Sequence, residues 1–257
     1  IYGIGILLWS AATISCGLAN SFALLLLTRI FVGVGETTQP AATSLMADYY
    51  PSDRRVAASS ITVLAVPLGA FIGSAAGGAI AEIADWRWAF FAAGAPGLIL
   101  GALFLLTIRD PLRGHYDPPS AHGDAVPPFS AALRRMVQRS AFLHVAIGSS
   151  LASAGGFGIN LFMAPYFARR FGMGFADSGL IAGLISAVPG VVSMFAGGQL
   201  ANRLARRDVR FYAWVPGVGV LLACPLYLLS LLQEQWLAAV GVFMVTGIFQ
   251  YVYLPCS

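Results

Sequence analysis

The chain alternates between long apolar runs and short polar gaps, and this pattern predicts its elements. A helix needs about 20 apolar residues to cross the hydrocarbon core of a bilayer. By that measure the sequence predicts eight membrane-spanning helices, and the fold class is an all-α membrane protein. The predicted helices lie near residues 1–19, 22–47, 57–81, 87–108, 141–167, 175–200, 211–232 and 236–257.

One polar interval, 109–140, is much longer than the others and contains five prolines, which is typical of a linker. We therefore expect a partial N-terminal helical bundle over 1–110, a linker over 111–140 and a partial C-terminal bundle over 141–257. Within the linker, "FSAALRRMVQRS" places its apolar residues on one helical face and its arginines largely off it. This predicts a short interfacial helix, and the alternative is a soluble connector with accidental periodicity.

Composition supports a membrane protein, because 58% of the residues are hydrophobic and only 10% are charged. A soluble domain carries roughly 25% charged residues and could not cover its surface with so few. The three cysteines, Cys16, Cys224 and Cys256, lie far apart in apolar segments. Because no pair has metal-ligand spacing, we expect no metal site and no cofactor.

All fifteen basic residues that carry the positive charge are arginines, because the chain has no lysine. Their distribution along the chain predicts its orientation in the membrane. Eleven arginines lie in the second, fourth and sixth gaps, three lie in the other gaps, and Arg29 lies within a predicted span. This is the positive-inside pattern, so we expect the linker to be cytoplasmic. Arginines confined to such gaps do not form a nucleic-acid-binding face, and we expect no nucleic-acid partner.

Two charged residues, Arg29 and Glu36, lie inside the second predicted span. Positions seven apart share a helical face but lie roughly 10.5 Å apart along the axis, too far for a tight salt bridge. Because a lone charge in hydrocarbon costs several kcal/mol, each needs a partner on another helix or a wet cavity. We expect this face to line a polar cavity; the alternative is a purely structural ion pair with another helix.

Three motifs, taken in order, resemble those of the major facilitator superfamily. The first is Arg29-x-x-x-Gly33-x-Gly35-Glu36, and the second is Gly69-x-x-x-Gly73-Ser74-x-x-Gly77-Gly78. The third is "GGQLANRLARRDVR" at 197–210, in which Asn202 stands where the family pattern has aspartate. More narrowly, "VGVGETTQPAATSLMADYYP", "VPLGAFIG" and "ADWRWAF" resemble the spinster-like branch, whose known members move lysophospholipids or sphingoid phosphates.

The resemblance implies a major facilitator fold with two pseudo-symmetric bundles. The family's basic loop precedes the third helix of each half, so the eight predicted helices would be the third to tenth of twelve. We therefore expect an incomplete sequence that lacks two helices at each end, and the alternative is a natural eight-helix protein.

Candidate functional residues follow from the motifs and from polar positions within the spans. The glycine-rich stretch around Gly155, Gly156, Gly158 and Pro165 predicts an interrupted seventh helix of the kind that lines transport sites. The glycines four residues apart after Pro67 predict close helix packing or a gating hinge. Candidates for substrate binding or coupling are Arg29, Glu36, Gln39, Phe157, Asn160, Tyr166, Gln250 and Tyr251. Candidates for gating or structural roles are Gly33, Gly35, Asp48, Arg54, Arg55, Pro67, Gly69, Gly73, Gly77, Asn202, Arg203, Arg206 and Arg207.

The sequence thus favours a secondary active transporter that works by alternating access in a bacterial inner membrane. We expect a monomer that moves an amphipathic lipid such as a lysophospholipid or sphingosine-1-phosphate, with possible coupling to protons. The alternative substrates are polar organic anions or drugs, and a channel or receptor is a third reading. We expect no enzyme: His144 shares one predicted helix with Ser149 and Ser150, which does not form a protease site, and a chain without lysine has no phosphate-binding glycine–lysine loop.

Overall fold

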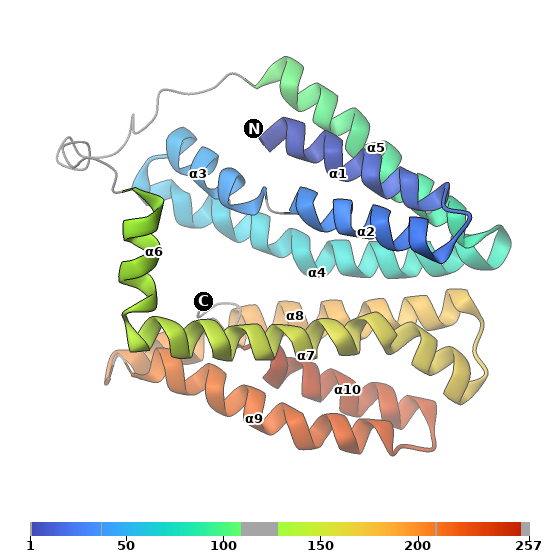
Figure 1. Cartoon of the computed structure of the whole chain (residues 1–257). Helices are drawn as coiled ribbons and strands as arrows, with labels where there is room; N and C mark the ends of the chain where they lie inside the picture. The colour runs from blue at the N-terminus through green and yellow to red at the C-terminus, as the bar shows by residue number, and fades with distance from the viewer. Residues whose placement is uncertain (1, 37, 109–127, 209, 253–257) are drawn as a thin grey trace. The chain divides into compact units, whose positions relative to one another are not determined.

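The computed structural model describes residues 2–36, 38–108, 128–208 and 210–252, and these residues are almost wholly helical (Figure 1). Within them the helices follow the order α1 (Tyr2–Gly17), α2 (Phe22–Glu36), α3 (Gln39–Tyr49), α4 (Ser52–Ile83), α5 (Trp86–Thr107), α6 (Phe129–Val137), α7 (Ser140–Phe171), α8 (Phe175–Ala205), α9 (Phe211–Leu231) and α10 (Trp236–Tyr251). Residues 111–127 of the predicted linker and the end of the last predicted span lie outside the described residues.

Five segments are long and apolar enough to cross a membrane: Leu64–Ile83 in α4, Trp86–Thr107, Phe142–Phe171 in α7, Phe175–Ala205 and Ala213–Leu231 in α9. The helices α1 and α10 are also apolar but shorter. These findings confirm the predicted all-α membrane fold class. Within the predicted linker, α6 covers Phe129–Val137, and Phe129 is exposed. The place of α6 at the membrane interface stays a prediction.

The second predicted span, 22–47, was wrong as a continuous helix, because α2 ends at Glu36 and α3 begins at Gln39. Pro40 lies in the first turn of α3. A proline has no N–H to donate and its ring clashes with the carbonyl four residues earlier, here that of Glu36. The Thr38 hydroxyl instead donates to the Gly35 carbonyl at 3.1 Å, which satisfies one carbonyl at the end of α2.

The predicted interruption of the seventh helix was also wrong. The helix α7 continues from Ser140 to Phe171 through Gly155, Gly156, Gly158 and Pro165. A single proline removes one backbone hydrogen bond, and glycine lowers helix propensity without breaking the helix. The helix ends where Gly172 adopts φ 66°, a left-handed conformation that favours glycine.

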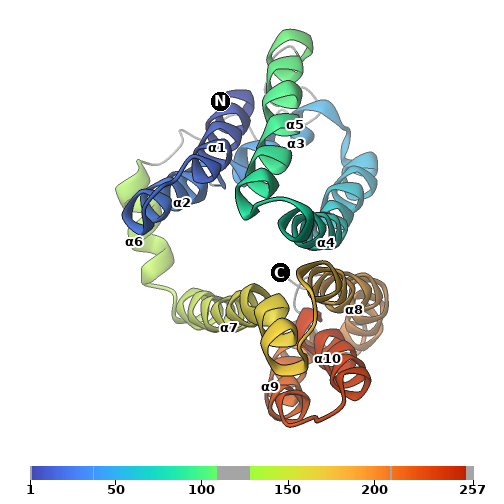
Figure 2. The ribbon, with the colours of Figure 1, turned by 90° about the vertical axis from the view of Figure 1, so that its right-hand side faces the viewer.

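The chain forms two compact units, Ile1–Val66 with Ala76–Ala125, and Pro67–Ala75 with Val126–Ser257. In the first unit α1 packs along both α5 and α2 (Figures 1 and 2). Glycines allow this close approach: a Cβ built on Gly94 would lie 2.9 Å from the Ser10 carbonyl oxygen, and one on Gly17 would lie 2.9 Å from the Arg87 carbonyl oxygen. Small residues bring membrane helices into backbone contact in this way.

In the second unit α10 packs against α8 and α9, and α7 packs against α8 (Figure 2). Its core centres on Phe167 of α7, Ile185 of α8 and Phe243 of α10, all of which are buried. This core holds α7, α8 and α10 in register, and it thereby positions the polar side chains described next.

Candidate functional site

A cluster of uncharged polar side chains lies where α7, α8 and α10 meet within the second unit. Asn160 of α7 is at its centre: its Nδ2 donates to the Tyr251 hydroxyl of α10 at 3.0 Å and to the Gly156 carbonyl at 2.9 Å. Its Oδ1 accepts from the Ser186 hydroxyl of α8 at 2.5 Å. The amide therefore has a partner for both N–H groups and for its oxygen. We call Asn160, Ser186, Gln250 and Tyr251 the polar cluster.

Gln250 joins the polar cluster from α10 and is only 5% exposed. Its Nε2 donates to the Ala152 carbonyl of α7 at 3.3 Å. A Cβ built on Gly156 would lie 3.1 Å from this Nε2, so glycine at that position makes room for the amide. Gly156 thus acts by close approach rather than by breaking the helix, whereas a Cβ built on Gly155 or Gly158 would meet no described neighbour.

The structure brings together Asn160, Gln250 and Tyr251, which sequence reasoning selected from two distant segments. It adds Ser186, which sequence reasoning missed because a serine in an apolar helix gives no signal of its own. The Ser186 hydroxyl also lies 3.0 Å from the Ala182 carbonyl, so it can exchange its hydrogen bond to Asn160 for one within α8.

Two further candidates on α7 lie apart from the polar cluster. Phe157 is 76% exposed, and its role in contacting a substrate stays a prediction. The Tyr166 hydroxyl donates to the Leu231 carbonyl at 3.4 Å, and its ring packs on Phe167 and Phe243. Tyr166 lies six residues from Asn160, roughly 9 Å along the helix, and belongs to the hydrophobic core.

In the first unit both Arg29 and Glu36 are exposed on α2, and within the described part of the chain neither forms an ion pair. This agrees with the expectation that residues seven apart do not pair with one another. Glu36 is the last residue of α2, at the break before α3. The side chain of Gln39 lies outside the described residues, so its role stays a prediction.

The glycines of the first two motifs differ in their surroundings. A Cβ on Gly35 would lie 2.7 Å from the Trp9 Cβ and 2.9 Å from its Cα, so Gly35 allows α2 to cross α1 closely. No described atom lies within 4 Å of a Cβ built on Gly33, Gly69, Gly73 or Gly77. Packing across these glycines therefore stays a prediction, as does a hinge beside the buried Pro67.

The arginines of the second gap have different roles. The Arg55 guanidinium donates to the Tyr50 carbonyl at 2.9 Å and to the Ala47 carbonyl at 2.6 Å. It therefore caps the C-terminal end of α3, where a cation is favourable. Arg54 is exposed, and Asp48 is half-buried near the end of α3.

The arginines of the third motif follow a different pattern. Arg203, Arg206 and Arg207 are exposed at the end of α8, and the side chain of Asn202 lies outside the described residues. Among the residues that the structure describes, no group of three His, Cys, Asp or Glu is placed to hold a metal ion.

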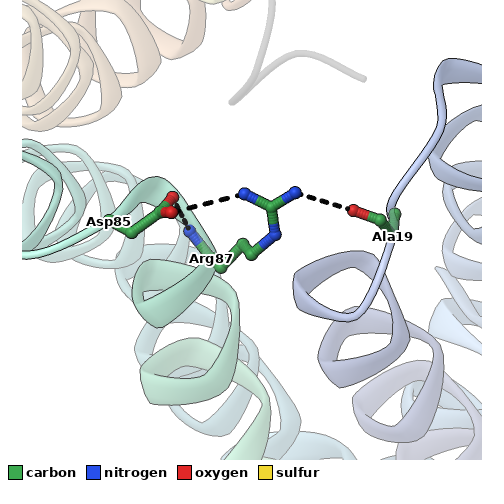
Figure 3. Close-up of polar contacts among 3 residues, drawn as sticks. All are labelled: Ala19, Asp85 and Arg87. Atoms are coloured by element: carbon green, nitrogen blue, oxygen red, sulfur yellow. Dashed lines mark hydrogen bonds and ion pairs between the residues drawn. The ribbon is translucent and has the colours of Figure 1, made fainter.

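Sequence reasoning overlooked a polar tie in the first unit, between the start of α5 and the loop after α1 (Figure 3). Asp85 is the N-cap of α5 and accepts from the Arg87 N–H at 3.2 Å. The Arg87 guanidinium donates to the Asp85 carboxylate at 3.3 Å and to the Ala19 carbonyl at 3.1 Å, and it lies 4.3 Å from the centre of the Trp86 ring. Aspartate before an aromatic helix start signals the cap, but only the fold brings Ala19 to Arg87.

The chain belongs to the Major Facilitator Superfamily, whose family model matches residues 1–257. It is therefore a multi-pass membrane protein with that family's fold. Among relatives, it is 30% identical to an MFS-type efflux pump of Mycolicibacterium smegmatis over 229 residues, which cover 89% of this chain and 52% of the relative. It is 31% identical to human protein spinster homolog 1 over 249 residues, which cover 88% of this chain and 46% of the relative.

A solved structure supports the spinster-like resemblance. The chain matches a bacterial homologue of the human lysosomal transporter Spinster, in an inward-facing and unoccupied conformation, with a TM-score of 0.78 and 28% identity. The match covers 99% of this chain and 59% of that one. The chain thus spans about half the length of the curated relatives described above.

Proposed function

We propose that the chain acts in secondary active transport of an amphipathic lipid, such as a lysophospholipid or sphingosine-1-phosphate, by alternating access. The observation that carries this proposal is the polar cluster, because uncharged donors and acceptors within an apolar bundle suit a substrate with a polar head and an apolar tail. The relatives support the class of substrate: one, from Danio rerio, is a sphingosine-1-phosphate transporter, 28% identical over 166 residues that cover 62% of this chain and 33% of the relative.

In this proposal each candidate residue has a role that follows from the chemistry of its side chain. Arg29, which has no ion pair among the described residues, attracts an anionic head group. Asn160 and Tyr251 exchange their shared hydrogen bond for bonds to the substrate, Gln250 gives up its bond to the Ala152 carbonyl, and Gln39 assists from the start of α3. The exposed Phe157 contacts the apolar tail. Glu36 exchanges a proton between states and couples transport to the proton gradient.

The proposal also specifies the membrane in which the protein works and the side on which its linker lies. The arginine asymmetry favours a cytoplasmic linker over 111–140 in a bacterial inner membrane. The protein works there as a monomer whose partners are the lipid bilayer, its substrate and protons. Arg203, Arg206 and Arg207 form the cytoplasmic gate, while the glycines after Pro67 allow α4 to bend.

The test is transport of a labelled lysophospholipid in proteoliposomes. Asn160→Leu removes the central amide at similar volume, and uptake is expected to fall by at least tenfold while the helical content stays the same. A matched control is Gln233→Leu, because among the described residues the partner of the Gln233 amide is the Leu229 carbonyl, at 3.0 Å, near the end of the preceding helix α9. Equal uptake by Asn160→Leu and Gln233→Leu would overturn the role of the polar cluster.

The second candidate function is export of polar organic anions or drugs. It is favoured by the resemblance to the efflux pump of Mycolicibacterium smegmatis. Transport of a fluorescent drug, with no transport of lysolipid, would support export over lipid transport. In both cases Asn160→Leu is expected to reduce the observed activity.

A further inference from the structure

A cavity of about 410 Å³ lies between α8, α9 and α10 within the second unit, apart from the polar cluster. Its lining is apolar throughout and includes Leu200 and Leu204 of α8, Trp214 and Val218 of α9, and Phe249 of α10. No member of the polar cluster lines it, although Phe249 and Val252, the residue after α10, flank Gln250 and Tyr251 in the chain. The volume lies within the range of about 300–1,000 Å³ that is typical of ligand pockets.

The shape of the cavity suits one extended alkyl chain. Its α9 wall is made by residues three or four apart from Phe211 to Leu222, which corresponds to roughly 16 Å of helix. A Cβ built on Gly219 would lie 2.7 Å from the Phe249 carbonyl oxygen, so glycine lets α9 and α10 meet at the back of the cavity. Trp214 and Val218 are 66% and 48% exposed, so the cavity opens to the outside of this unit.

Positive charge is concentrated next to one end of this cavity. The charged loop, here residues 203–210, comprises the end of α8 and the turn before Phe211 and includes the lining residue Leu204. It contains four arginines and one aspartate, a net charge of +3. The four arginines are exposed and, within the described ranges, make no ion pair. Asp208 accepts a hydrogen bond from the Arg210 backbone N–H at 2.9 Å. Guanidinium groups form strong bidentate hydrogen bonds with phosphate oxygens.

Trp214 lies one turn of helix after Arg210, between the charged loop and the deeper apolar wall. Tryptophan is enriched at this level of a membrane protein, where its ring lies among the lipid head groups. The order along α9 is therefore cation, interfacial aromatic ring and apolar groove. This is also the order of phosphate, glycerol backbone and acyl chain along a phospholipid.

We propose that the cavity binds an anionic phospholipid of the adjacent leaflet, with one acyl chain along α9 and the phosphate held by Arg206, Arg207 and Arg210. The lipid is a resident ligand of the second unit and is distinct from a transported substrate. This inference does not rest on the proposed transport activity, because binding is measured without it.

The test uses quenching of tryptophan fluorescence by phospholipids that carry bromine on the acyl chains. The whole chain is reconstituted in bilayers with brominated phosphatidylglycerol or, at equal mole fraction, brominated phosphatidylcholine. The difference between the wild-type chain and Trp214→Phe isolates the signal of Trp214. We expect this site to prefer phosphatidylglycerol over phosphatidylcholine by at least fivefold. The attraction of a single arginine to anionic lipid strengthens binding by about that factor.

Two sets of variants separate the head-group and chain contacts. Replacing Arg206, Arg207 and Arg210 by Gln together should reduce the preference below twofold, as should high salt. Val218→Phe, which fills the groove, should weaken quenching by both lipids. Its matched control is Leu221→Phe on the same helix, since Leu221 is 72% exposed and does not line the cavity.

Four outcomes would overturn the inference. Equal quenching by the two lipids at Trp214 would mean that the loop does not recognise the phosphate. Equal effects of Val218→Phe and Leu221→Phe would mean that no chain occupies the groove. If the quenching of Trp214 by brominated phospholipid were lost when lysolipid is added, and only then, the cavity would be a site for a transported substrate. Absence of any quenching above that by bulk lipid would show that protein covers the cavity.

Discussion

At the scale of single residues, the candidate polar side chains differ in whether they already have a hydrogen-bond or ion-pair partner among the described residues. This difference decides how each of them could respond to a substrate. Asn160 satisfies its whole amide with Tyr251, Ser186 and the Gly156 carbonyl, so it can respond to a substrate only by giving up existing hydrogen bonds. Within the described part of the chain, Arg29 and Glu36 are exposed and form no ion pair. These two residues are therefore the most direct sites at which to separate substrate binding from proton coupling.

Glu36→Gln keeps the size and polarity of the side chain but removes its proton exchange. If Glu36 couples protons to the conformational change, the variant should fold and should lose most of the pH dependence of transport. The measurement is uptake or release of labelled lysolipid in proteoliposomes over a pH series. Arg29→Ala is the companion variant, and it should weaken binding of an anionic lipid while keeping the pH profile. A wild-type pH profile in Glu36→Gln would make Glu36 a structural residue.

Asp85→Ala should lower the free energy of unfolding by about 1 kcal/mol, because it removes the N-cap of α5. It also removes the Asp85 carboxylate as an acceptor for the Arg87 guanidinium, which keeps its hydrogen bond to the Ala19 carbonyl. Thermal unfolding of the purified chain in detergent measures the loss. Glu234→Ala, a change of a carboxylate outside the helices, is the control and should unfold at the wild-type temperature. An equal loss in both variants would exclude the cap as the cause.

At the scale of helices, the contacts of α1 with α5 depend on glycines that the sequence did not single out. A Cβ on Gly94 would lie 2.9 Å from the Ser10 carbonyl oxygen and 3.1 Å from the Ile14 backbone nitrogen. Backbone atoms cannot move aside as the end of a flexible side chain can. The space at each glycine, rather than its propensity, therefore decides the effect of adding a methyl group.

Gly94→Ala should destabilise the chain, while Gly148→Ala should leave it unchanged or stabilise it. No described atom lies within 4 Å of a Cβ at Gly148 in α7, so alanine there gains the roughly 0.5–1 kcal/mol of better helix propensity. Thermal unfolding of both variants under the same conditions makes the comparison. If Gly94→Ala were as stable as Gly148→Ala, α1 and α5 could not be in backbone contact in solution.

The sequence predicted the helices well and their partners poorly, for physical reasons. Burial in lipid demands long apolar helices, so length and polarity indicated α1, α4, α5 and α7–α10. In such helices apolar residues occupy every face, and periodicity does not show which face packs; Gly69 and Gly94 look alike in sequence yet differ in surroundings. Pro40 illustrates the opposite case, since its local effect on the carbonyl of Glu36 could have been read from the chain.

The candidate site was partly predictable for the same reasons. Asn160 and Gln250 are amides within apolar runs, and such residues need partners wherever they lie. Their partners, Ser186 and the Ala152 carbonyl, depend on how α7 packs against α8 and α10. The apolar cavity beside Trp214 could not be predicted from the sequence. When a helix is apolar on every face, its sequence does not show which face lines a groove and which face packs against another helix.

At the scale of the whole molecule, the arginines at the end of α8 are the residues that we propose as the cytoplasmic gate. If Arg203 helps to hold the cytoplasmic side closed, Arg203→Gln should shift the population toward the inward-open state. The measurement is the reactivity of introduced cysteines on the two sides of the membrane, which should rise on the cytoplasmic side and fall on the other. Arg139→Gln, an exposed arginine at the start of α7, is the control. Unchanged reactivity on both sides would remove Arg203 from the gate.

The backbone contacts between α1 and α5 have a further consequence for measuring motion. Helices joined at Gly17 and Gly94 with no room for a methyl group beside the facing backbone cannot slide past one another, so the pair should translate and rotate as one stiff strut. Spin labels placed on its exposed positions, such as Leu8 of α1 and Leu103 of α5, should keep a constant separation through a transport cycle. The label distance across this strut is therefore a fixed reference, and the displacement of any other helix can be measured relative to it.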